Sequence, residues 1–194
     1  MPFICISIGI VLTGGLHFDG LIDTADGISA GSKRCLEAMK DSRVGAIGIL
    51  ILIITIFLQI AALFKLKMFY IFVLPITSFW GRYSQIVAIT KYPYVQEGGS
   101  SKFHKENSSG LLIESIPSII FIILINIILL NLSLSFTIKL GLIISTFIGI
   151  LCSTIIPNLL ARRLKFLSGD SYGASVVLVE TSMLIIFAFL LPVI

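Results

Sequence analysis

The chain has 194 residues, of which 57% are apolar and only 12% are charged, and its formal net charge is +4. This composition excludes a disordered chain, which needs low hydrophobicity and high charge. It also argues against a soluble domain, because a chain of this length encloses too little interior to hide so much apolar surface. The small basic excess favours an anionic membrane surface, and not nucleic acid, as the partner of the basic residues.

Five apolar runs are each long enough to cross the ~30 Å core of a bilayer, which takes ~20 helical residues. A sixth run, residues 1–16, is apolar but short, so it predicts a partial span or a helix that stops inside the protein. The runs are too long for strands, and backbone groups in lipid must be satisfied within the segment. We therefore predict an all-α, polytopic membrane protein with about six membrane helices. The long runs are residues 44–64, 68–90, 115–138, 140–161 and 174–194.

The basic residues are divided unevenly between the connections of these spans. The connections at residues 16–43, 91–114 and 162–173 hold ten of the fourteen Lys and Arg, whereas the two intervening connections hold three. By the positive-inside rule, the richer connections face the cytoplasm. Nine of the ten acidic residues lie in the same three connections. We therefore predict a single integral membrane domain over residues 1–194, in the cell membrane, with an active site that faces the cytoplasm.

The first connection contains three aspartates, Asp19, Asp23 and Asp26, at positions i, i+4 and i+7. In a helix these positions share one face, about one turn apart. Carboxylates stacked in this way repel one another unless a cation lies among them, and Mg²⁺ typically bridges carboxylates to substrate phosphates. The pattern predicts a Mg²⁺ site for phosphoryl transfer, with Asp23 and Asp26 also catalytic. The alternative is a solvated acidic face at a helix start, which the flanking glycines and the lack of interspersed lysines disfavour.

These aspartates belong to a longer pattern. Residues 14–27 read Gly-Gly-Leu-His-Phe-Asp-Gly-Leu-Ile-Asp-Thr-Ala-Asp-Gly, and residues 37–48 read Glu-x-Met-Lys-Asp-Ser-Arg-x-Gly-x-x-Gly. Later pieces are Arg82, Tyr-Pro-Tyr at 92–94, Gly-Asp-Ser-Tyr-Gly-Ala at 169–174, and Glu180. In order and spacing, these pieces resemble the cobalamin synthase family, the adenosylcobinamide-GDP ribazoletransferases. The resemblance covers nearly the whole chain.

The resemblance implies a reaction and its partners. Adenosylcobinamide-GDP and α-ribazole (or its 5′-phosphate) give adenosylcobalamin (or its 5′-phosphate) and GMP, in the last step of nucleotide-loop assembly. A ribose hydroxyl attacks the phosphorus attached to cobinamide, the acids hold Mg²⁺ against the pyrophosphate, and Asp41 is a candidate acceptor of the hydroxyl proton. The implied partners are these small molecules and the lipid bilayer. The sequence leaves the oligomeric state open, a homo-oligomer included.

The chain departs from the family pattern at several positions. Members are usually longer, with a further hydrophobic segment before the Gly-Gly-x-His motif, so we expect this chain to be N-terminally short. Gln96 stands where an arginine is expected, Lys165 and Phe166 where a pair of glycines is expected, and Val177 where a glutamate is expected. These departures bear on the strength of substrate binding more than on metal chemistry.

Several other polar residues are candidates for substrate binding, and each has a simpler structural interpretation. Lys40 and Arg43 could hold a pyrophosphate, or they could anchor the chain at the interface. Arg82, inside a span, faces either a cavity or an ionic partner, for which Glu180 is the candidate. Asp170 suits either a helix N-cap or a metal or ribose contact.

The remaining candidates are a histidine and an aromatic segment. His17 is either a structural residue or a general base and substrate contact. Tyr94, with Tyr92 and Pro93, forms either an interfacial aromatic belt or a stacking platform for a substrate base. The cysteines have no metal-like spacing, and we interpret them as small buried hydrophobes. They are Cys5, Cys35 and Cys152.

Two other functions compete with a ribazoletransferase. Residues 23–30 resemble the opening of the CDP-alcohol phosphotransferase motif, Asp-x-x-Asp-Gly-x-x-Ala, although Gly31 stands where that motif has arginine. This favours a lipid phosphotransferase as one alternative. The other alternative is a small membrane transporter, which would need paired polar residues deep in several spans. Only Arg82 and Glu180 are charged residues of that kind.

Overall fold

The computed structural model describes residues 2–94, 100–131 and 136–191, and the regular structure of these residues is helical. The prediction of an all-α protein is therefore confirmed. A 3₁₀ turn, η1 (Lys67–Phe69), separates the fourth and fifth helices. The helices are α1 (Pro2–Leu12), α2 (Leu16–Ser29), α3 (Cys35–Lys40), α4 (Ala46–Leu66), α5 (Tyr70–Lys91), α6 (Ser100–Glu106), α7 (Leu111–Asn131), α8 (Phe136–Leu164) and α9 (Gly169–Leu190).

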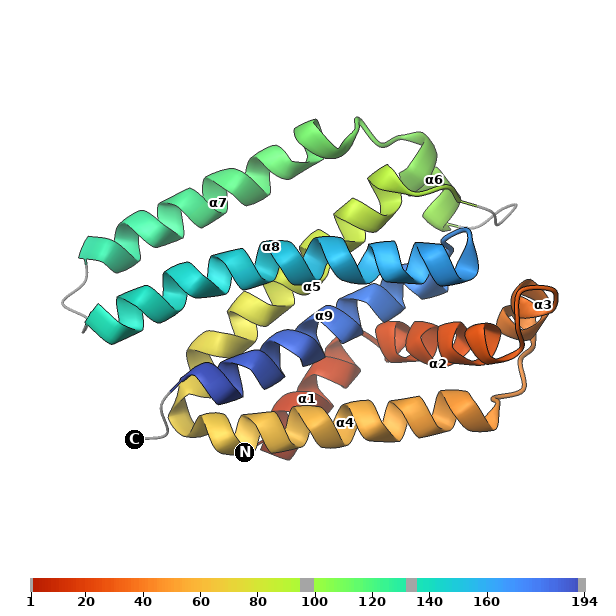
Figure 1. Ribbon diagram of the computed structural model, residues 1–194, viewed down its shortest axis with the longest axis horizontal. Coiled ribbons are helices and arrows are strands. Elements are labelled where there is room, and N and C mark those ends of the chain that lie inside the picture. Colours follow the sequence, from red (N-terminus) through yellow and green to blue (C-terminus); the bar gives the residue numbers. More distant parts are fainter. Residues whose placement is uncertain (1, 95–99, 132–135, 192–194) are drawn as a thin grey trace.

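Helix α9 is the core of the bundle (Figure 1). It packs against α2, α4, α5 and α8. In its most apolar window of 18 residues, 61% are buried, against 28% in each of the other candidate spans. A helix that is apolar on all sides can be covered by protein or by lipid. The central position of α9 is therefore decided by its packing and not by its apolar sequence alone.

Three segments of the described residues are long and apolar enough to cross a membrane: Ala46–Lys91, Ile143–Leu164 and Gly169–Leu190. The first contains α4 and α5, between which the chain turns back at η1 (Figure 1). Helices α1 and α2 are long and apolar enough to cross a membrane only if they are counted as one span, and the chain bends by 87° between them. Because α2 has only 14 residues and carries three aspartates, we treat it as lying outside the spanning segments. The predicted count of six spans is not confirmed.

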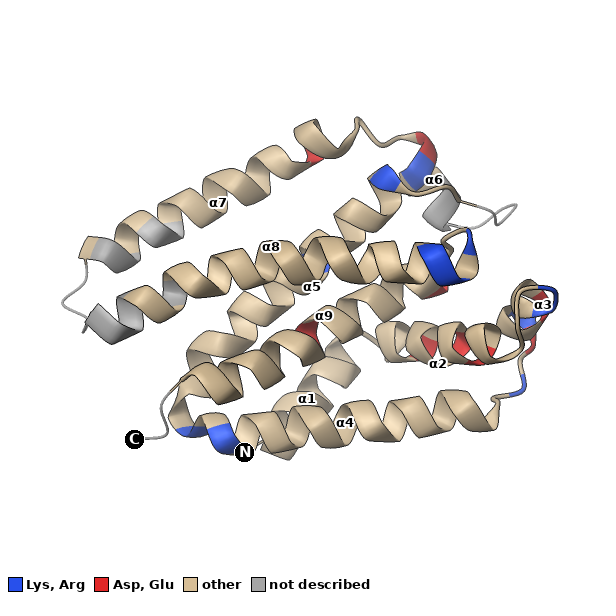
Figure 2. Ribbon diagram, in the orientation of Figure 1, with Lys and Arg blue, Asp and Glu red and all other residues tan. Residues whose placement is uncertain are grey.

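The outer surfaces of the bundle have the composition of a membrane protein. Large apolar side chains are exposed along α4, α7 and α8, among them Phe57, Phe121 and Phe147. Figure 2 shows that charged residues gather where α2, α3 and α6 lie, while few occur along the length of α7 and α8. Contiguous exposed apolar surface of this extent is rare on a soluble monomer. The surface therefore agrees with helices that contact lipid.

Two predicted boundaries need correction. Helix α8 begins at Phe136, so Lys139, predicted to separate two spans, lies inside a helix. Helix α9 begins at Gly169 and not at residue 174, because Ser168 and Ser171 form a capping box. The N–H of Ser168 donates to Oγ of Ser171 at 2.7 Å, and the N–H of Ser171 donates to Oγ of Ser168 at 3.4 Å. The Gly-Asp-Ser-Tyr-Gly motif is therefore the first turn of α9.

The packing of α8 on α5 can be tested at Gly149. A Cβ at this position would overlap the indole ring of Trp80, which is 3% exposed and has no room to move. We expect Gly149→Ala to lower the stability of the protein in detergent, because overpacking costs about 1–3 kcal/mol against a gain of about 1 kcal/mol in helix propensity. Thermal unfolding measures the difference.

The matched control is Gly141→Ala in the same helix. A Cβ at Gly141 would have Leu191 as its nearest neighbour, at 3.7 Å, so this variant should be as stable as the parent or more stable. If Gly149→Ala were at least as stable as Gly141→Ala, the described contact between α8 and α5 would be wrong.

Candidate active site

Helices α2 and α9 touch through their backbones at a glycine. A Cβ at Gly20 would overlap the carbonyl oxygen of Asp170. This contact brings the first turn of α9 beside the aspartates of α2, which lie about 150 residues earlier in the chain. Asp23 has Asp19 and Asp170 as electrostatic neighbours. We call Asp19, Asp23 and Asp170 the acidic cluster.

The acidic cluster concentrates negative charge in a partly buried place. Burial is the largest cause of a pKa of about 6 for Asp23, and repulsion from Asp19, Asp170 and Asp26 raises the pKa of this carboxyl further. Among the described residues, the ion pairs are Arg34–Glu37 and Arg43–Asp41, and neither includes a member of the cluster. The cluster therefore attracts a cation.

The third aspartate of α2 has a different role. Oδ2 of Asp26 accepts the N–H of Gly45 at 2.8 Å, and Oδ1 accepts the N–H of Gly48 at 2.8 Å. N–H groups at a helix start have no partner inside their own helix, and a carboxylate also suits the positive end of the helix dipole. A Cβ at Gly45 would overlap the same carboxylate. Asp26 therefore joins α2 to the N-terminus of α4, and its predicted roles in metal binding and catalysis stay predictions.

The acidic cluster does not form a complete metal shell by itself. No three His, Cys, Asp or Glu side chains within the described ranges are close enough to hold a metal ion. The type of donor nevertheless fits Mg²⁺, which is usually held by one or two carboxylates together with waters and substrate phosphates. Asp19 and Asp23, one turn apart on α2, are the residues that could supply these carboxylates, with Asp170 beside them.

Asp41 and Arg43 bind each other at the exposed end of α3. Nη2 of Arg43 donates to Oδ2 of Asp41 at 2.8 Å, and the backbone N–H of Arg43 donates to Oδ1 at 3.0 Å. These hydrogen bonds lower the pKa of Asp41 to about 2. A carboxylate with such a pKa is a weak base, so Asp41 can act as the predicted proton acceptor only after Arg43 has moved away. Lys40 is exposed at the end of the same helix.

The tyrosine segment supports the first turn of α9. The ring of Tyr94 stacks on Tyr172, with ring centroids 6.2 Å apart. The N–H of Leu167 donates to the carbonyl of Pro93 at 2.9 Å. Tyr94 therefore contacts the helix start that carries Asp170, an arrangement that an interfacial belt does not require. Gln96 lies outside the described residues.

The Gly-Gly-x-His motif forms the sharp turn between α1 and α2. Gly14 and Gly15 both have positive φ, 60° and 73°, a conformation that only glycine adopts without strain. The turn places His17 against α9, where a Cβ at Gly173 would lie 3.2 Å from Cα of His17. His17 is 8% exposed, and its Nδ1 has no hydrogen-bond partner among the described residues.

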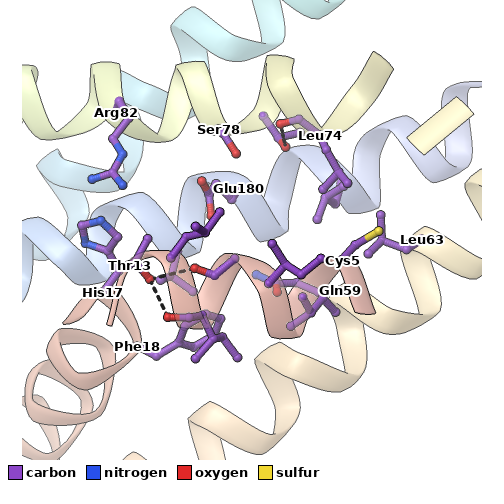
Figure 3. A pocket seen from close by; sticks show the side chains of 18 residues that line it. Cys5, Thr13, His17, Phe18, Gln59, Leu63, Leu74, Ser78, Arg82 and Glu180 are labelled. Carbon is purple, nitrogen blue, oxygen red and sulfur yellow. Dashed lines mark hydrogen bonds between the residues drawn. The ribbon is translucent and has the colours of Figure 1, made fainter. Parts of the chain in front are cut away.

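His17 and Arg82 line a cavity of ≈450 Å³ between α1, α2, α4, α5 and α9 (Figure 3). Figure 3 shows Arg82 directed toward His17, and Glu180 directed toward Ser78. Arg82 has no carboxylate within 4.0 Å in the described part of the chain, since the ion pairs found there involve other residues. Arg82 and Glu180 therefore form no direct ion pair, although their charges still interact electrostatically, and both side chains line the cavity.

Uncharged polar residues also line this cavity, and none of them was among the predicted site residues. Gln59, Thr77 and Ser78 line it from α4 and α5. Nε2 of Gln59 donates to Oγ1 of Thr181 at 2.8 Å, which ties α4 to α9 inside the bundle. An amide in the middle of an apolar span is itself a signal, because polar groups in a membrane segment usually face the protein interior.

Comparison with known proteins agrees with the resemblance seen in the sequence. Residues 1–188 match the family described as Cobalamin-5-phosphate synthase. A relative named adenosylcobinamide-GDP ribazoletransferase, from a strain of Prochlorococcus marinus, is 61% identical over 193 residues, which cover 99% of this chain and 74% of the relative. A relative of the same name from Thermosynechococcus vestitus is 33% identical over 186 residues, which cover 95% of this chain and 71% of the relative. No solved structure matches the chain.

The assignment of Asp26 predicts a stability defect. In Asp26→Asn the amide nitrogen cannot accept a hydrogen bond, so one N–H at the start of α4 loses its partner, and the favourable charge at the helix N-terminus is also lost. We expect the free energy of unfolding to fall by about 1–3 kcal/mol. Thermal unfolding of the protein in detergent measures this change.

Asp19→Asn is the matched control, since Asp19 lies on the same helix and is exposed. This variant should leave stability near that of the parent. Equal stability of the two variants would show that Asp26 does not hold α2 against α4.

Proposed function

The chain belongs to the cobalamin-5-phosphate synthase family, and we propose that it catalyses the reaction for which its relatives are named. The substrates are adenosylcobinamide-GDP and α-ribazole (or its 5′-phosphate), and the products are adenosylcobalamin (or its 5′-phosphate) and GMP. This is the final step of cobalamin assembly. The observation that carries the proposal is the 61% identity over 99% of the chain, and an acidic cluster suited to phosphoryl transfer supports it.

The acidic cluster would serve the pyrophosphate of the donor substrate. Carboxylates repel a pyrophosphate, so the cluster can bind one only with a cation between them. When bound, Mg²⁺ would neutralise the charge that develops on the phosphoryl oxygens. We propose that Asp19 and Asp23 hold this ion, with Asp170 beside them. Asp26 keeps α2 in position through its bonds to the start of α4.

Basic residues near the C-terminal end of α2 would complete the site. Lys40, the last residue of α3, and Arg43, which follows this helix, are exposed, and α3 packs on α2. Their charges suit the phosphate oxygens, and Arg43 offers bidentate contacts. A phosphate that binds Arg43 would compete with Asp41 for the same guanidinium. Release from Arg43 would raise the pKa of Asp41, which is a condition for its role as proton acceptor.

The proposal includes a location in the cell membrane, with the acidic cluster on the cytoplasmic face. Its support is the uneven division of basic residues between the connections. The gathering of charged residues near α2, α3 and α6 agrees with it (Figure 2). A homo-oligomer is a separate prediction, which cross-linking in membranes would test.

Loss of the charge of Asp23 should abolish most of the activity. Asp23→Asn keeps the shape of the side chain but weakens its hold on a divalent cation, whose stabilisation of charge contributes several kcal/mol. We therefore expect the rate of GMP release from adenosylcobinamide-GDP to fall about 100-fold or more. The assay uses membranes that contain the protein, with and without α-ribazole, at saturating Mg²⁺.

Arg34→Gln is the control for a change of charge, because Arg34 is exposed in the turn before α3, and it should keep the parental rate. A parental rate in Asp23→Asn would remove Asp23 from the metal site. A CTP-derived donor in place of the GDP-derived donor tests the lipid phosphotransferase alternative, and we expect no turnover with it.

The topology can be tested with single cysteines in a background that lacks the three native ones. Cysteines at the exposed positions Lys33 and Arg163 should react with an impermeant maleimide only from the cytoplasmic side. A cysteine at Met68, in the turn between α4 and α5, should react only from the opposite side. Labelling of all three positions from one side would refute the proposed arrangement.

A further inference from the structure

The cavity between α1 and α9 reaches His17, near the acidic cluster. His17, at its edge, is two residues before Asp19 and contacts Gly173, about one turn after Asp170. The cavity measures ≈450 Å³, which is within the range of pockets that enclose small organic molecules. It is too small for a corrinoid ring with its side chains. Its position and its size together suit a small reactant that meets a phosphorus at the cluster.

Much of the cavity wall is apolar. Leu63, Val177 and Leu184 are among its apolar side chains, and Gln59, Thr77, Ser78 and Glu180 are polar groups set between them. Such walls favour a flat, apolar group and disfavour a phosphate, whose charge would lose its hydration there.

The end of the cavity at His17 is polar. Nδ1 of His17 itself is buried against Gly173 of α9 and not open to the cavity. Arg82 lines the cavity, points toward His17 (Figure 3) and has no carboxylate within 4.0 Å in the part of the chain that is described. An arginine within a span usually serves a function. Arg82 therefore indicates a ligand with hydrogen-bonding groups at this end.

We propose that this cavity binds the acceptor nucleoside, with its neutral aromatic base against the apolar walls and its ribose hydroxyls at His17 and Arg82. The inference rests on the proposed function, in which the acceptor is α-ribazole. The cavity has one cationic side chain, Arg82, and one acidic side chain, Glu180, so its formal charge suits a neutral ligand. The ribose would then lie at the His17 end of the cavity, which is the end nearer to the proposed position of the attacked phosphorus.

Filling the cavity tests the proposal. Leu74 of α5 lines the cavity (Figure 3), and Leu74→Trp would occupy the space of the base. We expect the dissociation constant of α-ribazole, measured by equilibrium dialysis with the detergent-solubilised protein, to rise about tenfold or more, since burial of an aromatic group of this size is worth at least that factor. The KM for adenosylcobinamide-GDP should change less than twofold.

The matched control is Phe72→Trp, two residues away on the same helix, where the side chain is 68% exposed on the outer surface. It should leave both constants unchanged. Thermal unfolding of each variant shows whether it is folded. If Leu74→Trp does not fold, Leu184→Phe replaces it as the filling variant.

The polar end is tested with Arg82→Gln, which should also weaken α-ribazole binding while leaving the binding of free benzimidazole, which has no ribose, within twofold of the parent. An unchanged affinity for α-ribazole in the filling variant would overturn the proposal, as would absence of binding to the parent or an equal loss of donor and acceptor binding. Absence of binding to the parent, or an equal loss of donor and acceptor binding, would indicate a different occupant of the cavity, such as a lipid chain.

Failure of this proposal can be distinguished from failure of the proposed function. GMP release that needs α-ribazole, together with unchanged α-ribazole binding in Leu74→Trp, would uphold the reaction and reject the cavity as the acceptor site. Binding of α-ribazole that Leu74→Trp weakens, without any GMP release, would uphold the cavity and reject the reaction.

Discussion

The backbone contact between α2 and α9 organises the polar part of this protein. Gly20 lets the two helices approach until no atom fits between its Cα and the carbonyl of Asp170. Because glycine has no Cβ, the two backbones can approach this closely, and the side chains beside the contact are brought together. The same approach brings Gly173 against His17. One interface therefore supports both the acidic cluster and the polar end of the cavity.

A second contact fixes the position of α2 relative to α4. The carboxylate of Asp26 accepts both Gly45 and Gly48 N–H groups, so α2 is bound to the start of α4 as well as to α9. An acidic residue at a helix N-terminus satisfies donors that have no partner in the helix and balances the positive end of the dipole. Because Asp26 already binds α2 to α4, Asp23, one turn earlier on the helix, is available for another role.

The acidic cluster and the cavity offer opposite environments that meet at His17. The cluster is partly exposed, negatively charged and suited to a cation with phosphates. The cavity is partly open, largely apolar and supplied with a few hydrogen-bonding groups. A reaction that joins a charged phosphorus centre to a hydroxyl on an aromatic nucleoside needs both environments side by side. The membrane bundle supplies rigid helices for each, which keeps the two reactants oriented.

The sequence alone determined the all-helical class, the membrane class, the family and the helical face shared by Asp19 and Asp23. These are consequences of local periodicity, run length and motif spacing, which do not depend on distant contacts. The Asp41–Arg43 pair is also local, since the two residues are two positions apart. Their spacing alone, however, does not show whether they bind each other or each bind a ligand. The helix start at Gly169 was likewise encoded locally, in the capping serines.

Only the tertiary structure decided which partner each polar side chain has. Asp26 is bound by N–H groups from another helix. Arg82 points toward His17 and, in the described part of the chain, forms no ion pair within 4.0 Å with the acid that the sequence offered as its partner. The reason is that the angle between α1 and α2, set at Gly14 and Gly15, and the glycine contacts of α9 determine which faces meet. A face is a property of one helix and can be read from its sequence, whereas a cavity is a property of several helices and exists only once they are packed.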